Sequence, residues 1–127
     1  DEAILVTTPH ISSVRDAETV MTLLKGNGMT RIYVAVNRVR GDLVLSGEML
    51  SRGDVERLLG TEVFGMIPED DGMNLLSNAF DYGMSAGWSA SCALARGILS
   101  GVPEVFDLTK KYRGIFGGIK RRMKRRL

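Results

Sequence analysis

The chain has 127 residues, 44% of them hydrophobic and 25% charged, which is the composition of one globular domain and excludes a disordered protein. Its longest apolar runs are far too short to span a membrane. The one cysteine, Cys92, excludes an internal disulfide, and the one histidine, His10, leaves no Cys and His set for a zinc site.

Charge divides the chain into two parts. Residues 1–109 carry 8 basic and 15 acidic side chains, a balance of −7, whereas residues 110–127 carry 9 basic and no acidic ones, a balance of +9. Because nucleic-acid-binding domains carry basic surfaces, the acidic body argues against nucleic acid as a partner of the fold. We therefore predict a domain over 1–109 and a separate basic tail over 110–127.

Three short apolar runs, at 3–8, 31–37 and 62–68, are rich in Val and Ile and are bounded by Pro, Gly or Asn. The first two show little polar alternation, which is typical of strands buried on both faces of a parallel sheet. Helical periodicity lies between the runs, and parallel strands need crossovers of this kind. The sequence therefore predicts an α/β fold with a parallel sheet.

The two crossovers have helix start and stop signals. The first helix is expected to begin at the N-cap Ser13 and to end near Gly26 and Gly28, and the second to run from the N-cap Ser51 to Gly60. The first should turn these residues inward: Val14, Ala17, Val20, Met21 and Leu24. The second should bury Val55, Leu58 and Leu59.

After Pro68 the pattern is weaker. Residues 69–80 predict a short helix, 81–87 a loop and 88–101 a longer helix. The residues of that last helix expected to face the body are Trp88, Cys92, Leu94, Ala95, Ile98 and Leu99.

Polar side chains follow the second and third strands. In open parallel sheets, ligands bind beyond the carboxyl ends of the strands, and those positions hold Asn37, Arg38, Pro68, Glu69 and Asp70. An Asn amide offers a donor and an acceptor to the edge of a purine base. Alternatively, Asn37 caps a turn and Asp70 caps the next helix. No G-x-x-x-x-G-K-[ST] loop is present in the sequence, and no catalytic residue is predicted.

The segments DEAILVTTPHISSVRDAETV, VNRVR and GEMLSRGDVERLLGTEVFGMIPEDDG closely resemble the MinD-type ATPases of the ParA/MinD group. These are deviant P-loop ATPases of bacterial division-site placement. The resemblance covers roughly residues 1–78, and the tail resembles the membrane-targeting helix of the family. It implies the C-terminal half of a three-layer, Rossmann-like P-loop NTPase fold.

This resemblance has consequences for the chemistry. The phosphate loop and the Mg²⁺ ligands would lie in a missing N-terminal half, so the intact protein would use ATP and Mg²⁺ while this chain alone would hydrolyse nothing. The adenine pocket of the family carries over to Asn37, Arg38, Pro68, Glu69 and Asp70. If the phosphate-loop strand normally pairs beside residues 3–8, the chain exposes an apolar strand edge and is expected to be poorly soluble alone.

The resemblance also implies partners. The helix after the TTP motif contacts division regulators, of the MinC/MinE or MinC/DivIVA type, and Ser12, Asp16 and Glu18 match positions used for this purpose. His10 departs from the acidic residue usual at its place, which bears on regulator specificity. An ATP-bound homodimer, cytoplasmic and peripheral on the inner face of the plasma membrane, is expected.

Wound as a helix, residues 112–127 gather their large apolar side chains within an arc of roughly 120°. The predicted membrane-binding residues are Tyr112, Ile115, Phe116, Ile119, Lys120, Met123, Lys124 and Leu127. An apolar seam flanked by cations is what an interfacial helix on anionic lipid requires. Two alternatives are a packed C-terminal helix with a basic outer face and a nucleic-acid arm. For the whole chain, the alternative to a MinD-like function is a non-catalytic module that tethers a partner to the membrane.

Overall fold

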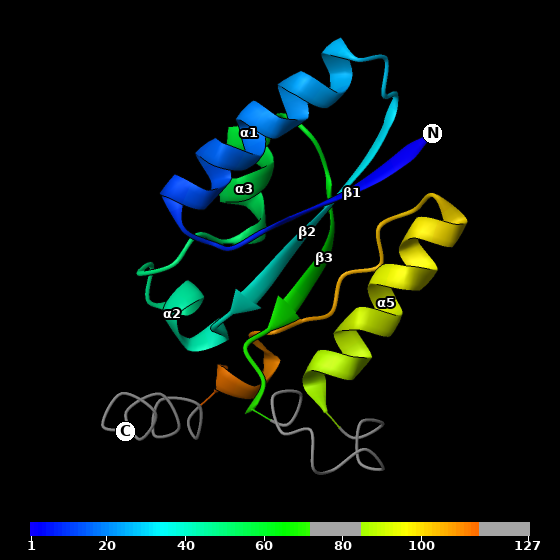
Figure 1. The fold of residues 1–127 in the computed structure, drawn as a ribbon. Coiled ribbons are helices and arrows are strands. Elements are labelled where there is room, and N and C mark those ends of the chain that lie inside the picture. Colours follow the sequence, from blue (N-terminus) through cyan, green and yellow to red (C-terminus); the bar gives the residue numbers. More distant parts are fainter. Residues whose placement is uncertain (72–84, 115–127) are drawn as a thin grey trace.

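The structure is a computed structural model, which describes residues 1–71 and 85–114. In these residues three strands form one parallel sheet in the order β1-β2-β3: β1 is Glu2–Thr7, β2 is Arg31–Val39 and β3 is Val63–Pro68. The predicted parallel α/β sheet is thus confirmed. All three strands end at the same edge of the sheet (Figure 1), which is the edge where the polar cluster was expected.

The pairing of the strands brings the ends of β2 and β3 together. β1 and β2 pair without interruption from Glu2 opposite Arg31 to Thr7 opposite Val36. The pairing of β2 with β3 shifts twice and finishes with Val39 opposite Pro68. One further bond follows, since the backbone N–H of Glu69 donates to the carbonyl of Val39 at 3.0 Å. The two loops that leave these strands therefore start side by side.

Helices α1 (Ile11–Gly26) and α3 (Arg52–Leu59) cover one face of the sheet (Figure 1). Their buried side chains Val14, Ala17, Met21, Val55 and Leu59 form the core with the valines of β2. Burying such side chains stabilises a fold by about 1.5–3 kcal/mol each.

Two details of α1 differ from the prediction. The helix begins earlier, with His10 as its N-cap, because the hydroxyl of Ser13 instead accepts a hydrogen bond from Thr8 Oγ1 at 2.8 Å. Val20, predicted to face inward, is 42% exposed because it lies beside the buried stripe.

Helix α3 begins and ends as predicted. The Ser51 hydroxyl accepts from the backbone N–H of Asp54, the Asp54 carboxylate accepts from the backbone N–H of Ser51, and Gly60 ends the helix with a left-handed φ of 63°. This is a complete capping box. Leu58, predicted to be buried, is 42% exposed.

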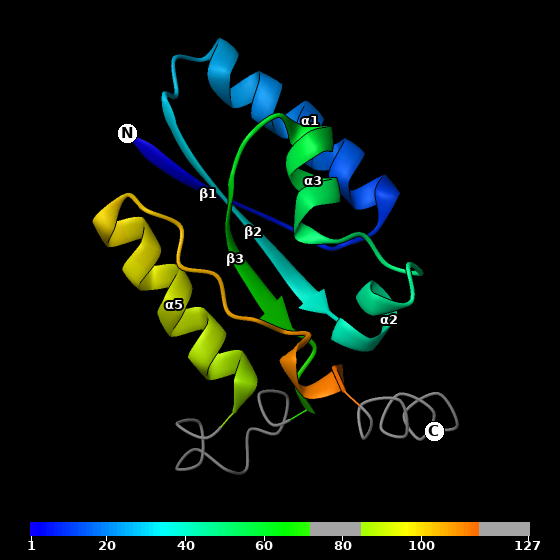
Figure 2. The ribbon, with the colours of Figure 1, turned by 180° about the vertical axis from the view of Figure 1, so that it is seen from behind.

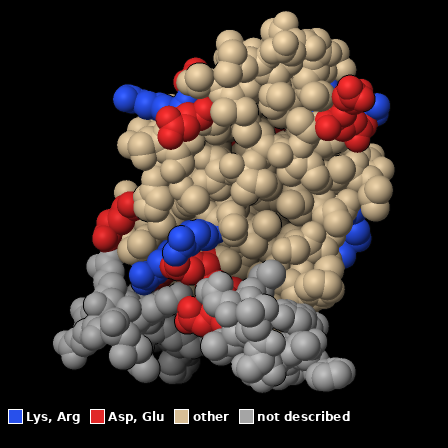
Figure 3. All heavy atoms as spheres, viewed as in Figure 1, with Lys and Arg blue, Asp and Glu red and all other residues tan. Residues whose placement is uncertain are grey.

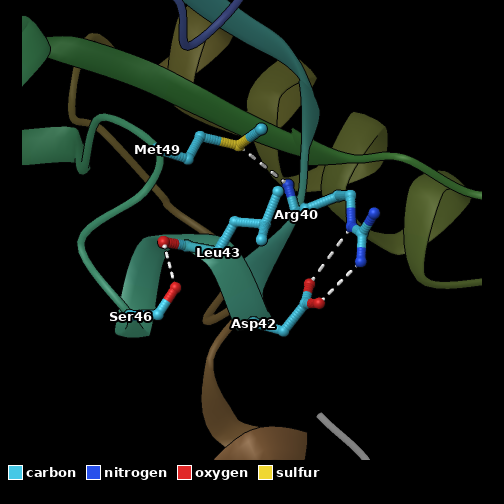
Figure 4. A network of polar contacts seen from close by, with 5 residues as sticks. All are labelled: Arg40, Asp42, Leu43, Ser46 and Met49. Carbon is cyan, nitrogen blue, oxygen red and sulfur yellow. Dashed lines mark hydrogen bonds and ion pairs between the residues drawn. The ribbon is translucent and has the colours of Figure 1, made fainter. Parts of the chain in front are cut away.

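A short helix that was not predicted, α2 (Gly41–Leu45), follows β2 directly. It is held by the side chains at its start. Asp42 is fully buried and pairs with Arg40, whose guanidinium lies 2.7 Å away (Figure 4). The backbone N–H of Arg40 also donates to the sulfur of Met49 at 3.3 Å, which brings the end of the α2–α3 loop back onto β2.

Helix α5 (Ala86–Ser100) covers the opposite face and packs on β3 (Figure 2). Its buried residues are small: Gly87, Ala90, Ala93 and Gly97. This corrects the predicted inward face, because Trp88 is 45% and Leu99 88% exposed. Leu94, another of the predicted inward residues, does face β3, since a Cβ on Gly65 would lie 2.9 Å from Leu94 Cδ1, while the fully buried positions are the smaller Ala90 and Ala93.

The described part of the chain ends with the 3₁₀ turn η2 (Lys110–Tyr112), beneath α2. Arg113 is extended and Gly114 has a φ of 90°, so an α-helix does not run through residues 112–114. The predicted tail helix cannot include them. The predicted helix within 69–80 and the predicted loop over 81–87 lie for the most part outside the described residues, as do residues 115–127.

Strand β1 lies at one edge of the described sheet, and α5 packs mainly on β3, at the opposite edge. As a result, Ile4 and Val6 are 56% and 60% exposed. A broad central area of the molecule carries neither Lys, Arg, Asp nor Glu (Figure 3). The predicted apolar strand edge is therefore present in the described residues, while the poor solubility expected from it stays a prediction. The helices of the described ranges are each too short or too polar to cross a bilayer.

Candidate functional site

A cleft of about 490 Å³ lies at the carboxyl ends of β2 and β3. Its lining contains all five residues predicted for a ligand site: Asn37, Arg38, Pro68, Glu69 and Asp70. Two further residues complete it, Ile67 of β3 and Ser91 of α5. Segments thirty residues apart in sequence thus meet in one place, as the topology of a parallel sheet requires.

The first wall of the cleft is the irregular Asn37–Arg38 segment near the end of β2, where the pairing with β3 shifts register. The backbone N–H of Arg38 donates to Asn37 Oδ1 at 2.8 Å, and Arg38 has a φ of 59°. This left-handed conformation is costly for a residue with a Cβ. It carries the guanidinium toward Glu69, whose carboxylate lies 3.2 Å away. Both side chains are open to solvent, so this ion pair contributes at most about 1 kcal/mol.

The second wall is the Pro68–Glu69–Asp70 turn. Glu69 is held by its backbone bond to Val39, and Asp70 Oδ2 accepts from the backbone N–H of Gly87 at 2.8 Å. Asp70 therefore binds the first turn of α5, which is not the next helix along the chain that the alternative named, and Asn37 binds the backbone of Arg38 within the last part of β2. Both residues nevertheless line the cleft, and the Asn37 amide keeps two N–H donors.

Ser91 was missed by sequence reasoning. Its hydroxyl donates to the carbonyl of Gly87 at 2.9 Å, one helical turn earlier. Asp70 fixes the same Gly87 through its N–H, so the cap and Ser91 are parts of one arrangement. The spacing of Ser91 from Gly87, one helical turn, can be seen in the sequence. That Asp70 binds the same glycine could not be predicted from it.

The loop below the cleft is stiffened by ionic contacts. The hydrogen bond from Arg40 to Asp42, in a pair that is three-quarters or more buried, raises the pKa of the arginine above its ordinary value. This pair fixes the chain directly after the Asn37–Arg38 segment of β2. Breaking a buried pair by removing one partner leaves a buried charge and is strongly destabilising.

The lining suits a flat heteroaromatic ring. Ile67 and Pro68 supply apolar surface, while the Asn37 amide, the Arg38 guanidinium and the Glu69 carboxylate offer donors and acceptors at its edge. Small-molecule sites commonly combine apolar walls with a few polar groups in this way. Metal chemistry has no comparable support in the ranges 1–71 and 85–114, where no three acidic, His or Cys side chains cluster to hold an ion.

Comparison with known proteins decides the family. No protein-family model matches the chain. A MinD relative from Chlorella vulgaris is 34% identical over 120 residues, which cover 91% of this chain and 43% of the relative. The MinD cell division protein of Aquifex aeolicus superposes with a TM-score of 0.72 and 31% identity, over 79% of this chain and 44% of that one.

The chain is a MinD-type sequence. The MinC:MinD cell division protein complex of Aquifex aeolicus matches equally well, with a TM-score of 0.71 and 31% identity over 79% of this chain and 43% of that one. The chain thus spans less than half of the length of these MinD proteins. The part of the MinD-type fold found in this chain includes the three-stranded sheet and the cleft at its strand ends.

The predicted regulator residues of this MinD-type chain lie on α1, and all three are exposed. Ser12 and Asp16 are one turn apart and share a face of the helix. Glu18 lies about 200° further around from Asp16, since each residue advances by about 100°. The structure therefore groups two of the three residues and separates the third.

One predicted membrane residue is corrected by the structure. Tyr112 is only 4% exposed and packs beneath α2, so it is a core residue here and not part of an exposed lipid-facing seam. The Tyr112 ring, which the periodicity assigned to the seam, instead packs near Gly41 and holds the start of the tail against the domain. The other seven predicted membrane residues lie outside the described residues: Ile115, Phe116, Ile119, Lys120, Met123, Lys124 and Leu127.

Proposed function

We propose that this chain supplies the adenine-side wall, a regulator-binding helix and a lipid anchor to a MinD-like ATPase that positions the division septum. One observation carries the nucleotide part of the proposal, which is the meeting of Asn37, Arg38, Pro68, Glu69 and Asp70 in one cleft at the strand ends. The similarity to MinD proteins supports the assignment of that cleft to a nucleotide.

In this proposal the base of ATP lies against Pro68, and the Asn37 amide N–H groups donate to a ring nitrogen. Arg38 and Glu69 close the rim of the cleft. ATP supplies the bond that is cleaved and Mg²⁺ neutralises its phosphates, but the residues for those tasks are expected outside this chain. The isolated chain should therefore show no ATP turnover above buffer.

The nucleotide assignment can be tested in a chimera in which this chain replaces the matched 120 residues of the Chlorella relative. Asn37→Ala should weaken ATP binding about three- to tenfold, as expected for one hydrogen bond of about 0.5–1.5 kcal/mol. The matched control is Asn27→Ala, at the C-cap of α1 and remote from the cleft. Equal ATP affinities in the two variants would show that Asn37 does not contact the base, and a chimera that binds no ATP would favour the alternative, a tethering module.

The regulator part of the proposal places a MinC-type partner on the exposed face of α1 that carries Ser12 and Asp16. Support comes from the match to a MinC:MinD complex and from the exposure of these side chains. MinE- or DivIVA-type regulators are proposed for the same helix. Asp16→Lys should abolish pull-down of MinC, while Glu18→Lys, on another side of the helix, should reduce it less.

The membrane part of the proposal concerns residues 115–127. Each cation near an anionic surface contributes about 1 kcal/mol, and each large buried apolar side chain about 1.5–3 kcal/mol. Ordering the chain costs about 1–2 kcal/mol per residue, so a single copy should bind weakly. Two copies in an ATP-bound dimer would bind much more tightly through effective concentration, which would link nucleotide state to residence on the inner face of the plasma membrane.

The apolar seam and the charges can be separated by mutation. Phe116→Glu with Ile119→Glu should abolish binding to phosphatidylglycerol vesicles in a flotation assay. Arg121→Gln with Arg125→Gln lowers the charge by two, keeps the seam and should only weaken binding. Vesicle binding that survives the first pair of changes would rule out an interfacial helix.

A further inference from the structure

The start of the basic tail is packed into the fold next to the candidate nucleotide cleft. Tyr112 and Leu108 are 4% and 8% exposed, and both lie against Gly41, the first residue of α2. A Cβ at position 41 would lie 2.4 Å from the Leu108 carbonyl oxygen and 3.1 Å from Tyr112 Cε2. Only glycine allows this approach, so the fit of residues 108–112 against Gly41 is tight.

The cleft and the packed segment share two residues. A small cavity of about 90 Å³ separates the loops at the strand ends from the segment 106–112. Pro68 and Glu69 line this cavity on one side and the candidate nucleotide cleft on the other. The Glu69 N–H is bonded to the Val39 carbonyl. A displacement of Pro68 and Glu69 would therefore change the shape of both the small cavity and the candidate nucleotide cleft.

Electrostatic contacts add to the apolar packing at the start of the tail. Lys111 Nζ lies 5.0 Å from the centre of the Tyr112 ring, within the range of a cation–π contact. Arg113 faces Asp107 at 3.6 Å. We call the packed segment Leu108–Tyr112 the tail anchor. The first three cations of the tail lie in it or directly after it: Lys110, Lys111 and Arg113.

We propose that the tail anchor couples the tail to the nucleotide cleft through the shared Pro68–Glu69 turn, with Tyr112 as its positioning residue. This inference rests on the function proposed above. A base bound in the cleft restricts Pro68 and Glu69, which also line the cavity beside the anchor, so binding favours the docked anchor. By linkage, a loosened anchor must weaken binding of the base by the same factor.

The test uses the 127-residue chain and two readouts, tryptic cleavage after Lys110, Lys111 and Arg113 by mass spectrometry, and adenosine affinity by equilibrium dialysis. Without ligand, Tyr112→Ala should be cleaved at least tenfold faster than wild type, while Tyr112→Phe, which keeps the ring, should behave as wild type. If Tyr112→Ala does not fold, Tyr112→Leu replaces it. Cleavage of the chosen variant at the wild-type rate would overturn the anchor.

The coupling has its own outcome. Saturating adenosine should slow cleavage at these sites in wild type and in Tyr112→Phe, and the variant with a loosened anchor should bind adenosine several-fold more weakly than either. Adenosine that binds wild type without slowing cleavage would overturn the coupling and leave the proposed function intact. If wild type binds no adenosine while the anchor variants differ in cleavage as expected, the proposed function fails and the coupling falls with it.

Discussion

The carboxylate of Asp70 accepts a hydrogen bond from the backbone N–H of Gly87 at 2.8 Å and thereby ties the end of β3 to the first turn of α5. The bond also bears on the candidate cleft, because Asp70 and Ser91 both line it and both bond Gly87. A second cap completes the helix start, because the backbone N–H of Trp88 donates to Ser85 Oγ at 3.0 Å.

Asp70→Ala should therefore destabilise the chain by about 0.5–2 kcal/mol, the usual cost of losing a helix cap. Asp70→Asn retains an acceptor at the same position and should cost only a fraction of this. Urea unfolding followed by circular dichroism measures both. Equal stabilities of the two variants would show that the bond to Gly87 does not hold α5.

Gly65→Ala should push α5 away from β3. The new Cβ would lie 2.9–3.2 Å from three side-chain atoms of Leu94, and overpacking of this kind typically costs about 1–3 kcal/mol. In the background of Leu94→Ala, two of those three atoms are absent. The cost of Gly65→Ala in that background should then be smaller, and a double-mutant cycle in urea measures the difference. An additive result would contradict the close contact.

Gly41→Ala should destabilise by an amount at the upper end of that range, since its new Cβ would meet the backbone of Leu108 at 2.4 Å. Gly53→Ala in α3 is the matched control, because its Cβ would meet only Ser51 Oγ, at 3.9 Å. There the better helix propensity of alanine should raise stability by up to about 1 kcal/mol. Thermal unfolding should thus shift in opposite directions for the two substitutions, and shifts of the same sign would refute the tight fit at Gly41.

The capping box predicts a dependence of stability on pH. Hydrogen bonds from the side chain and the backbone of Ser51 hold the pKa of Asp54 below its ordinary value. A lowered pKa in the folded state means that the stabilisation is complete above the unfolded pKa, near 3.9, and is lost as pH falls through the folded pKa.

Between pH 5 and pH 2.5, Asp54→Asn should therefore lose less stability than wild type, because asparagine does not titrate. Asp16→Asn, an exposed position on α1, serves as the control and should follow wild type. Melting temperatures measured over this pH range test the prediction. If the melting temperatures of wild type and Asp54→Asn fall equally with pH, the ionised Asp54 cap does not contribute to stability.

The exposed face of β1 predicts self-association. Ile4→Thr with Val6→Thr keeps β-branched side chains but removes two exposed apolar groups, so the double variant should be more soluble and more monomeric than wild type in sedimentation velocity. Leu5→Thr, whose side chain packs against the core on the other face, should destabilise the fold without this benefit. Unchanged association in the double variant would show that other surfaces cause it.

The sequence predicted those features that depend on local chemistry. The apolar runs of β1 and β2, the Ser51 cap and Gly60 follow from side-chain type and spacing alone, and the gathering of Asn37 with Pro68 follows from parallel topology. The buried face of α5 was not predictable by the same means. Periodicity favours large apolar residues such as Trp88 and Leu99, whereas the folded helix buries Ala90 and Ala93 and brings Leu94 against Gly65.

Long-range partners account for the remaining differences. Helix α2 depends on the pair of Arg40 with the buried Asp42, which looks in sequence like two solvated charges. Tyr112 fits a helical seam by its spacing, but the absence of a side chain at Gly41 creates the space that it fills. Such fits between distant segments leave no trace in the periodicity of either one.

Among the described residues other than glycine, Arg38 alone has a positive φ. A glycine would adopt this conformation without the penalty of about 1–2 kcal/mol that a Cβ brings. A sequence optimised for thermal stability alone would place glycine there and lose the guanidinium. The mouth of the cleft is thus a point where this domain retains a permanent positive charge at the expense of its own backbone energy.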